Sequence, residues 1–356
     1  MHGRLLTPGR AEVGTPGSAQ RPSRHRGARR ALGLVLLLLA FILSLVASML
    51  IGAKPLAFSD MSAAVTGTGD ESTTYVLRDL RGTRTVAGIV VGTALGVAGA
   101  LIQAFSRNPL ADPGILGVNA GASFFVVLGV GYLGVTSATG QVWFALVGAL
   151  LVTVLVCLIG AAGRGSSDPI RLTLGGVALA AVLTGITTAI MLLDQNTFSA
   201  MRSWNAGSLV GKEPELVGVI TPFLVVGLIV AGLVARPLNA VALGDELAAG
   251  LGAKVTRTRI GAVLAVTLLA GAATALAGPI GFLGLMVPHV ARWITGPSQP
   301  WIIACSAVIA PTLLLASDVL ARVILAPGEV PVGIVTAFVG APVLIALVRQ
   351  RRASSL

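Results

Sequence analysis

Charged residues are scarce in this chain of 356 residues. Asp, Glu, Lys and Arg together make up 11% of it, and aromatic residues only 4%. Soluble globular domains carry about 25% charged residues, so a water-soluble fold is excluded. Hydrophobic residues account for 55%, and the mean hydropathy is +0.91. Several apolar runs reach the roughly 20 residues that a helix needs to cross a bilayer, which predicts an integral membrane protein.

Cysteine and histidine are also rare. Cys157 and Cys305 both lie inside apolar runs, which argues against a disulfide or a metal pair. His289 is the one histidine outside the amino-terminal tail, and we interpret it as a structural hydrogen-bonding residue rather than a proton relay. The sequence contains no clustered catalytic set and no metal-ligand spacing, so we expect neither an enzyme nor a bound cofactor or metal.

Nearly all of the Asp and Glu residues lie at the ends of apolar runs rather than inside them. A transporter driven by protons or sodium would normally place carboxylates within the membrane, so that class is disfavoured. The segment 207–212 superficially resembles a phosphate-binding loop. It lacks one residue between its glycines, however, and Glu213 replaces the required Ser or Thr, so a nucleotide site is not expected.

The net charge of +11 comes largely from the first 30 residues. They hold seven arginines and one acid, Glu12, among Pro, Gly and Ser, a composition typical of a disordered basic tail. The charge is therefore no sign of nucleic-acid binding. The run at 31–52 is too long for a cleaved signal peptide. We expect a cytoplasmic tail at 1–30, a membrane domain at 31–350 and a short cytoplasmic tail at 351–356.

Ten apolar runs predict an all-α polytopic membrane protein. The expected spans are 31–52, 84–106, 114–133, 141–161, 171–193, 216–235, 257–277, 281–295, 300–320 and 332–348. The connections on the side of the amino terminus carry most of the 25 Lys and Arg residues. Because positively charged loops stay in the cytoplasm, both termini are predicted to be cytoplasmic.

Small residues form a strip along the second span, where Gly88, Gly92, Gly96 and Ala100 stand four apart. This spacing puts them on one helix face and predicts that a neighbouring helix packs there at backbone distance.

The segment 237–259 is the one long water-compatible stretch in the interior of the chain. Its apolar residues recur at three- and four-residue steps, with a start signal at Gly244 and Asp245 and stop signals at Gly250 and Gly252. The pattern predicts two short amphipathic helices joined at Gly244. Their apolar faces would lie outside lipid, so they are expected to contact another protein.

Three arginines, Arg78, Arg81 and Arg84, stand three apart before the second span, on the side predicted to be extracytoplasmic. Two interpretations are open: solvated charges with a neighbouring acid as partner, or a docking surface for an acidic extracytoplasmic protein. Near the end of the ninth span, Arg322 follows Asp318 by four residues, which predicts an ion pair between them.

Four ordered motifs together resemble the FecCD-type permeases of bacterial ABC importers. The motifs are RNPLADPGILGVNAGA at 107–122, LGDELAAGLG at 243–252, GPIGFLGLMVPHVAR at 278–292 and SDVLARVILAPGEVPVGIVTAFVGAPV at 317–343. The resemblance covers roughly residues 31–350. It implies a permease dimer in the bacterial cytoplasmic membrane, whose second subunit is an identical or a related chain. It also implies separate cytoplasmic ATPase subunits and an extracytoplasmic substrate-binding protein, often a lipoprotein.

The resemblance further implies roles for individual residues. The connection at 237–259 would couple to the ATPase through Gly244, Asp245, Glu246, Ala248, Leu251 and Gly252. Arg81, Arg84 and Arg322 would dock the binding protein, although the family usually reads Arg-x-Pro-Arg where this chain has Arg81-Gly82-Thr83-Arg84. The passage would be lined by the fifth and tenth spans, including Gly175, Gly176, Thr184, Thr187 and Thr188. The expected cargo is a ferric siderophore, with haem and cobalamin as alternatives.

Overall fold

The computed structural model describes residues 24–52, 56–66, 68–161, 169–325 and 328–353. This part of the chain is helical and contains no strand. Most of the predicted amino-terminal tail and residues 354–356 lie outside the described residues. The first helix begins at Arg24, inside the segment expected to be tail.

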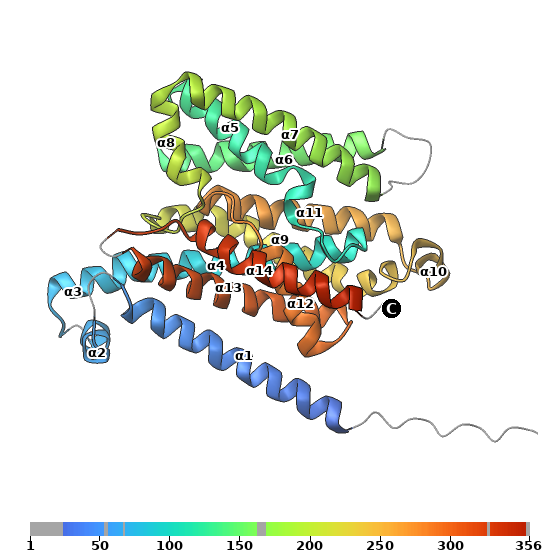
Figure 1. Ribbon diagram of the computed structural model, residues 1–356, viewed down its shortest axis with the longest axis horizontal. Coiled ribbons are helices and arrows are strands. Elements are labelled where there is room, and N and C mark those ends of the chain that lie inside the picture. Colours follow the sequence, from blue (N-terminus) through green and yellow to red (C-terminus); the bar gives the residue numbers. More distant parts are fainter. Residues whose placement is uncertain (1–23, 53–55, 67, 162–168, 326–327, 354–356) are drawn as a thin grey trace, which may run out of the picture.

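Helices of two lengths make up the fold (Figure 1). The long helices are α1 (Arg24–Leu50), α4 (Thr83–Ser106), α6 (Ala138–Ala161), α7 (Pro169–Leu193), α9 (Pro214–Val241), α11 (Val255–Ala277), α13 (Gln299–Ile324) and α14 (Val332–Ala353). The shorter ones are α2 (Phe58–Thr66), α3 (Glu71–Tyr75), α5 (Val118–Leu133), α8 (Gln195–Asn205), α10 (Asp245–Gly250) and α12 (Leu283–Thr295). A π-helical turn, η1 (Val76–Gly82), precedes α4, and a 3-10 turn, η2 (Pro113–Leu116), precedes α5.

Each of the ten predicted spans overlaps one helix. Seven of the helices in the described residues are long and apolar enough to cross a membrane, and α5 and α14 contribute shorter apolar segments. The helix α12 has 13 residues, about 20 Å at 1.5 Å per residue, so it covers only part of a hydrocarbon core of about 30 Å.

The connection at 237–259, expected to hold two short helices, differs from the prediction in its first half. Helix α9 does not stop near residue 235 but continues through Pro237 to Val241, so the first expected helix is the end of α9. The second is present as α10, and Gly244 joins the two as predicted.

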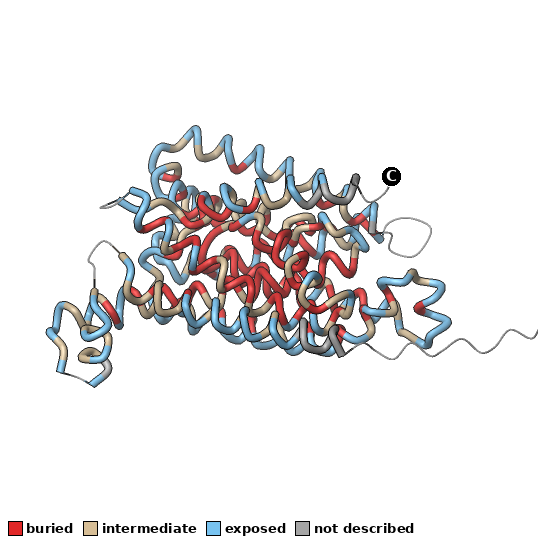
Figure 2. The backbone as a smooth tube through the Cα atoms, turned by 60° about the horizontal axis from the view of Figure 1, so that its bottom comes forward, coloured by how far each residue is buried: buried red, intermediate tan, exposed pale blue. Residues whose placement is uncertain are grey.

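Helix α4 forms the centre of the bundle and packs against α13, α11, α12 and α9. Its most apolar stretch is 78% buried within this chain, whereas that of α1 is 11% buried. The tube coloured by burial shows the same contrast between a buried centre and exposed outer helices (Figure 2). Helix α1 therefore presents most of its surface to the surroundings.

The small-residue strip on α4 is where α13 approaches, as predicted. A Cβ atom added to Gly92 would lie 2.4 Å from the Cα of Pro311, and one added to Gly96 would lie 2.5 Å from the carbonyl oxygen of Ser306. Neither position can accept a side chain without moving the backbone of α13. The strip therefore sets the distance between these two helices.

A short non-helical segment between α11 and α12 lies inside the bundle. Gly278 has a φ of 75°, and a Cβ there would lie 2.0 Å from the carbonyl oxygen of Trp204. The carbonyl of Ala277 accepts a hydrogen bond from the amide of Ser208 at 2.8 Å. Non-helical backbone is tolerated at membrane depth where protein satisfies its polar groups in this way.

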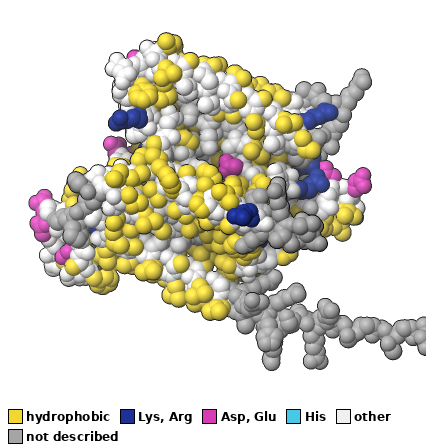
Figure 3. Space-filling view, in the orientation of Figure 1, with side chains coloured by type: hydrophobic (Ala, Val, Ile, Leu, Met, Phe, Trp, Pro, Cys, Tyr) yellow, Lys and Arg dark blue, Asp and Glu magenta, His cyan; other side chains and the backbone are white. Residues whose placement is uncertain are grey.

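The two ends of the bundle carry different elements. Helices α2, α3 and α8 lie at one end, and α10 and the carboxyl terminus lie at the other (Figure 1). Between them the face in view is broadly apolar, and most of its visible Asp and Glu side chains lie at its edges (Figure 3). Following the predicted orientation, we call the end with α2, α3 and α8 the outer end and the end with α10 the inner end.

Substitution of Gly92 by Ala tests the close packing of α4 on α13. The added methyl group meets backbone rather than a flexible side chain, so we expect a loss of about 1–3 kcal/mol, the usual cost of overpacking. Gly218 of α9 is the matched control because nothing lies within 4 Å of a Cβ placed there. Thermal unfolding in detergent should show a lower Tm for Gly92→Ala alone. Equal Tm values for the two variants would contradict the packing.

Candidate functional site

Helix α10 projects from the inner end with an apolar surface. Leu247 and Leu251, four residues apart, are 63% and 69% exposed, and Leu243 is also exposed. On the opposite side of the helix Ala248 is fully buried. Gly244, with a φ of 115°, makes the turn that leads into the helix. Exposed leucines gathered outside the membrane layer mark a surface that another protein can cover.

Asp245 fixes α10 to the bundle. One of its carboxylate oxygens lies 2.8 Å from Nη2 of Arg107, which ends α4, and the other lies 2.8 Å from Nη2 of Arg259 in α11. The Arg259 side chain is largely buried, whereas the Arg107 and Asp245 side chains are partly exposed. The neighbouring Glu246 is exposed and makes no ion pair or hydrogen bond with another described residue. The two adjacent acids therefore have different structural roles.

Near the inner end, polar contacts also join α4 to α12. The Gln103 side chain donates to the carbonyl of Leu285 at 2.9 Å and accepts from Nη2 of Arg292 at 2.7 Å. Nε2 of His289 lies 2.8 Å from the carbonyl oxygen of Pro109 and donates to it. This contact supports the structural interpretation of His289.

The connection between α4 and α5 is held by Asp112. Its carboxylate accepts from the amide of Gly114 at 2.8 Å and caps the turn η2. Burial raises the pKa of Asp112 above its ordinary value, and the hydrogen bond from Gly114 opposes that rise.

The outer end contains a buried cluster of charges on α4 and α13. Asp318 is fully buried and accepts from Nε and Nη2 of Arg84, the latter at 2.7 Å, and also pairs with Arg322, as the spacing predicted. Glu329 is partly exposed and pairs with Nη1 of Arg84 at 2.6 Å. Buried charges are tolerated when they are paired and hydrogen-bonded, as they are here.

Arginines also close the outer end of α1. The last four carbonyls of a helix have no partner within it. Here Arg322 donates to the carbonyls of Ser48 at 2.7 Å and Ile51 at 3.2 Å. Arg81 donates to those of Met49 at 2.7 Å and Leu50 at 2.9 Å. Cations at a helix carboxyl terminus also interact favourably with the helix dipole.

The three arginines expected to dock a binding protein are thus engaged within the chain. Arg81, Arg84 and Arg322 are 6%, 9% and 3% exposed. Docking through them stays a prediction. It requires their guanidinium groups to become accessible at this end, where Arg84 is paired with the partly exposed Glu329.

A hollow of about 490 Å³ lies between α5, α7 and α8. Three predicted passage residues, Thr184, Thr187 and Thr188, line it. Thr187 is 6% exposed, and its hydroxyl has no hydrogen-bond partner among the described residues. The described lining contains no Asp, Glu, Lys or Arg. The hollow therefore offers neutral hydrogen-bonding groups.

The two glycines predicted for the passage have a different position. A Cβ on Gly176 would lie 1.9 Å from the carbonyl oxygen of Ile115, and one on Gly175 would lie 3.0 Å from Ile159. Neither lines the hollow. They allow α7 to approach η2 and α6, so their evident role is packing.

Three polar residues of the hollow were not predicted: Asn119, Ser123 and Asn205. Asn119 accepts from the hydroxyl of Thr274 at 2.8 Å. Asn119 and Ser123 stand four apart in an otherwise apolar span, a spacing that places them on one helix face. The four-residue spacing could have identified Asn119 and Ser123 from the sequence. Asn205 lines the hollow only because α8 packs beside it.

Replacement of Asp318 by Asn tests the outer cluster. It would leave Arg84 and Arg322 buried without their shared countercharge, so we expect a loss of about 3–5 kcal/mol. Glu329→Gln is the control, since that side chain is 32% exposed and the loss should be smaller. Unfolding in detergent should rank the variants in this order. Equal stability of Asp318→Asn and the unmodified chain would rule out the cluster as a structural element.

Comparison with known proteins agrees with this architecture. Residues 36–350 match the model of the FecCD transport family. The chain is 47% identical over 323 residues to the ferric enterobactin transport system permease protein FepD of Escherichia coli (strain K12), covering 90% of this chain and 96% of that protein. It is 38% identical to the Fe(3+)-citrate import system permease protein YfmD of Bacillus subtilis (strain 168), covering 93% and 98%.

Solved structures share the fold at lower identity. A metal-chelate type ABC transporter in an inward-facing conformation superposes with a TM-score of 0.80 at 24% identity, covering 89% of this chain and 98% of that one. PsaBC from Streptococcus pneumoniae superposes with a TM-score of 0.57 at 14% identity, covering 80% and 94%. With its apolar helices and a family match over residues 36–350, the chain belongs to the FecCD transport family of multi-pass membrane proteins.

Proposed function

We propose that this chain is the permease subunit of a binding-protein-dependent ABC importer for a ferric siderophore in the bacterial cytoplasmic membrane. The observation that carries the proposal is the 47% identity to a ferric enterobactin permease over nearly the whole of both chains. Relatives at 36% to 39% identity are named for siderophore, Fe(3+)-citrate and iron(3+)-hydroxamate import. In this proposal the chain forms a passage with a second permease subunit, and hydrolysis takes place on separate ATPase subunits.

In the proposed transporter, α10 is the contact with the ATPase. Leu247 and Leu251 supply the apolar surface that such a contact would bury, and Ala248 fixes the helix to the bundle. Asp245 acts as a positioning residue, because its pairs with Arg107 and Arg259 make α10 move with α4 and α11. Gly244 and Gly252, with φ of 115° and 78°, supply turns at either end of the helix.

Helix α4 then connects the two ends of the permease. Arg84 at its outer end belongs to the buried charge cluster, and Arg107 at its inner end holds Asp245. The helix has 24 residues, about 36 Å at 1.5 Å per residue. A displacement of α10 would reach the outer end, where the binding protein docks, through this single buried helix.

The cargo would pass beside Thr184, Thr187 and Thr188. Neutral hydroxyl and amide groups can exchange hydrogen bonds with a bulky chelate without holding it by charge, which suits a passage from which the cargo must leave. Selection among chelates would rest mainly with the binding protein.

Uptake in cells that lack this chain tests the proposal. Labelled ferric siderophores, haem and cobalamin are compared with and without the restored gene. We expect loss and rescue of ferric siderophore uptake alone. Unchanged siderophore uptake together with reduced haem or cobalamin uptake would contradict the cargo.

Reversal of charge at the two adjacent acids tests the coupling. Asp245→Arg removes both pairs that hold α10, so we expect about ten-fold lower uptake, within the range of typical coupling free energies. Glu246→Arg reverses an exposed charge that has no partner among the described residues, so its effect measures the contribution of surface charge alone. Uptake and copurification of the ATPase are measured together. Equal effects of both reversals would show that Asp245 acts only through surface charge.

Cysteine labelling tests the passage. We expect the accessibility of Thr184→Cys and Thr188→Cys to change when substrate-loaded binding protein or ATP is added. Val182→Cys, exposed on the same helix but outside the hollow, should react at a constant rate. An unchanged rate at both threonine positions would count against the lining.

A further inference from the structure

A second and larger cavity lies at the outer end, away from the hollow. It is a groove of about 890 Å³ between α1, α2, α3, η1, α4 and the start of α9. The residues used below are Leu45 and Met49 of α1, Ala64 of α2, Arg78 of η1, and Thr83 and Ile89 of α4. Its size falls within the range of ligand-binding cavities.

The groove reaches into the membrane layer. Leu45 and Met49 belong to the candidate span Ala31–Leu50, and Ile89 belongs to Glu71–Ser106. All three are only partly buried, and α1 beside them has an exposed apolar face that includes Leu43 at 69%. Around these three side chains the groove offers water few hydrogen-bonding partners. In a bilayer, lipid acyl chains can enter the groove from the side.

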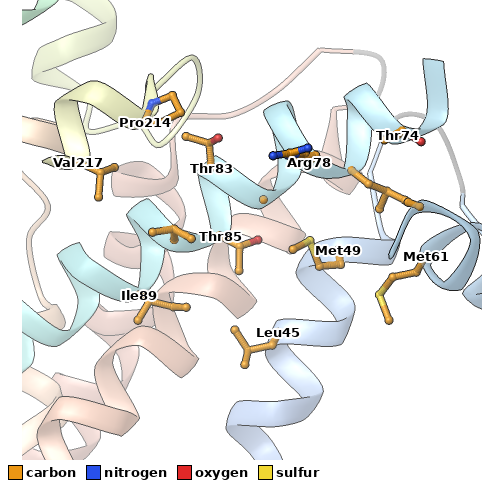
Figure 4. Close-up of a pocket in the computed structure, with 14 residues that line it drawn as sticks. Leu45, Met49, Met61, Thr74, Arg78, Thr83, Thr85, Ile89, Pro214 and Val217 are labelled. Carbon is orange, nitrogen blue, oxygen red and sulfur yellow. The ribbon is translucent and has the colours of Figure 1, made fainter. Parts of the chain in front are cut away.

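Within the groove, Arg78 lies away from Leu45 and Ile89 (Figure 4). Arg78, Thr74 and Thr83 lie in the upper part of the view together with Pro214, Leu45 and Ile89 lie in the lower part, and Thr85 lies between them. This order matches the way a phospholipid lies in a leaflet, with its headgroup at the membrane surface and its chains toward the centre.

Arg78 is the one charged side chain in the described lining of the groove. It is exposed and forms no ion pair or hydrogen bond with another described residue. In this it differs from Arg81 and Arg84, which are buried and engaged. A guanidinium group is well shaped to bind phosphate oxygens with two parallel hydrogen bonds.

We propose that this groove binds an anionic phospholipid of the outer leaflet, with its phosphate on Arg78 and an acyl chain along Leu45, Met49 and Ile89. The bound lipid would fill the space between the α1–α2 pair and α4. The site depends only on the chain lying in a bilayer, so it stands or falls independently of the cargo.

Native mass spectrometry of the purified full-length permease, titrated with phosphatidylglycerol or with zwitterionic phosphatidylcholine, tests the site. We expect phosphatidylglycerol to bind more tightly, and Arg78→Gln to weaken it about five-fold, the usual contribution of one basic residue near a membrane surface. Binding of phosphatidylcholine should change little. Arg202→Gln is the matched control, since Arg202 is exposed on α8 and does not line the groove.

Filling the groove gives an independent measurement. Ala64→Trp, or the smaller Ala64→Leu, should lower the binding of both lipids while the protein still elutes as a single species. Inorganic phosphate at millimolar concentration should not displace phosphatidylglycerol. Equal binding of the two lipids to the unmodified chain, undiminished binding in both Ala64 variants, or displacement by phosphate alone would overturn the proposal.

Discussion

The outer end of this protein depends on a single buried carboxylate. Asp318 has no exposed surface, yet it holds Arg84 from α4 and Arg322 from its own helix α13. Because Arg322 also donates to the last carbonyls of α1, the same carboxylate indirectly fixes the outer end of a helix that packs mainly against α13 and is otherwise largely exposed. In lipid, where water cannot replace a lost partner, each of these groups needs the others.

Helix α4 links the outer charge cluster to the inner end. Its small-residue strip sets its distance from α13, and its carboxyl-terminal Arg107 holds Asp245 of α10. Contacts of Gln103 with Leu285 and Arg292 add α12 to the same body. Helix α10, the centre of the bundle and the outer charge cluster are therefore joined through one buried helix, α4. The lipid groove lies beside the outer part of this element, between α4 and α1.

Local patterns in the sequence predicted much of this. Apolar runs predicted the helices, and turn signals predicted α10. Four-residue spacing predicted the glycine strip and the pair of Asp318 with Arg322. The pair of Arg84 with Asp318 joins residues 234 positions apart, and no local pattern reports such a contact. The caps on α1 and the amides of the hollow likewise depend on how distant helices are placed. Helix α9 continues through Pro237, and the full burial of Leu238 and Val241 beyond it shows tertiary packing overriding the break that a proline usually causes.

In the proposed transporter, α10 and α4 move as one body. Spin labels at Ala249→Cys on α10 and Val86→Cys on α4, two exposed positions, report the separation of the two helices by pulsed electron resonance in the assembled transporter, with Cys157 and Cys305 replaced by serine. We expect one narrow distance that stays constant with and without ATP, and a broadened distance in Asp245→Ala. A distance that changes with ATP in the protein with Asp245 intact would contradict it.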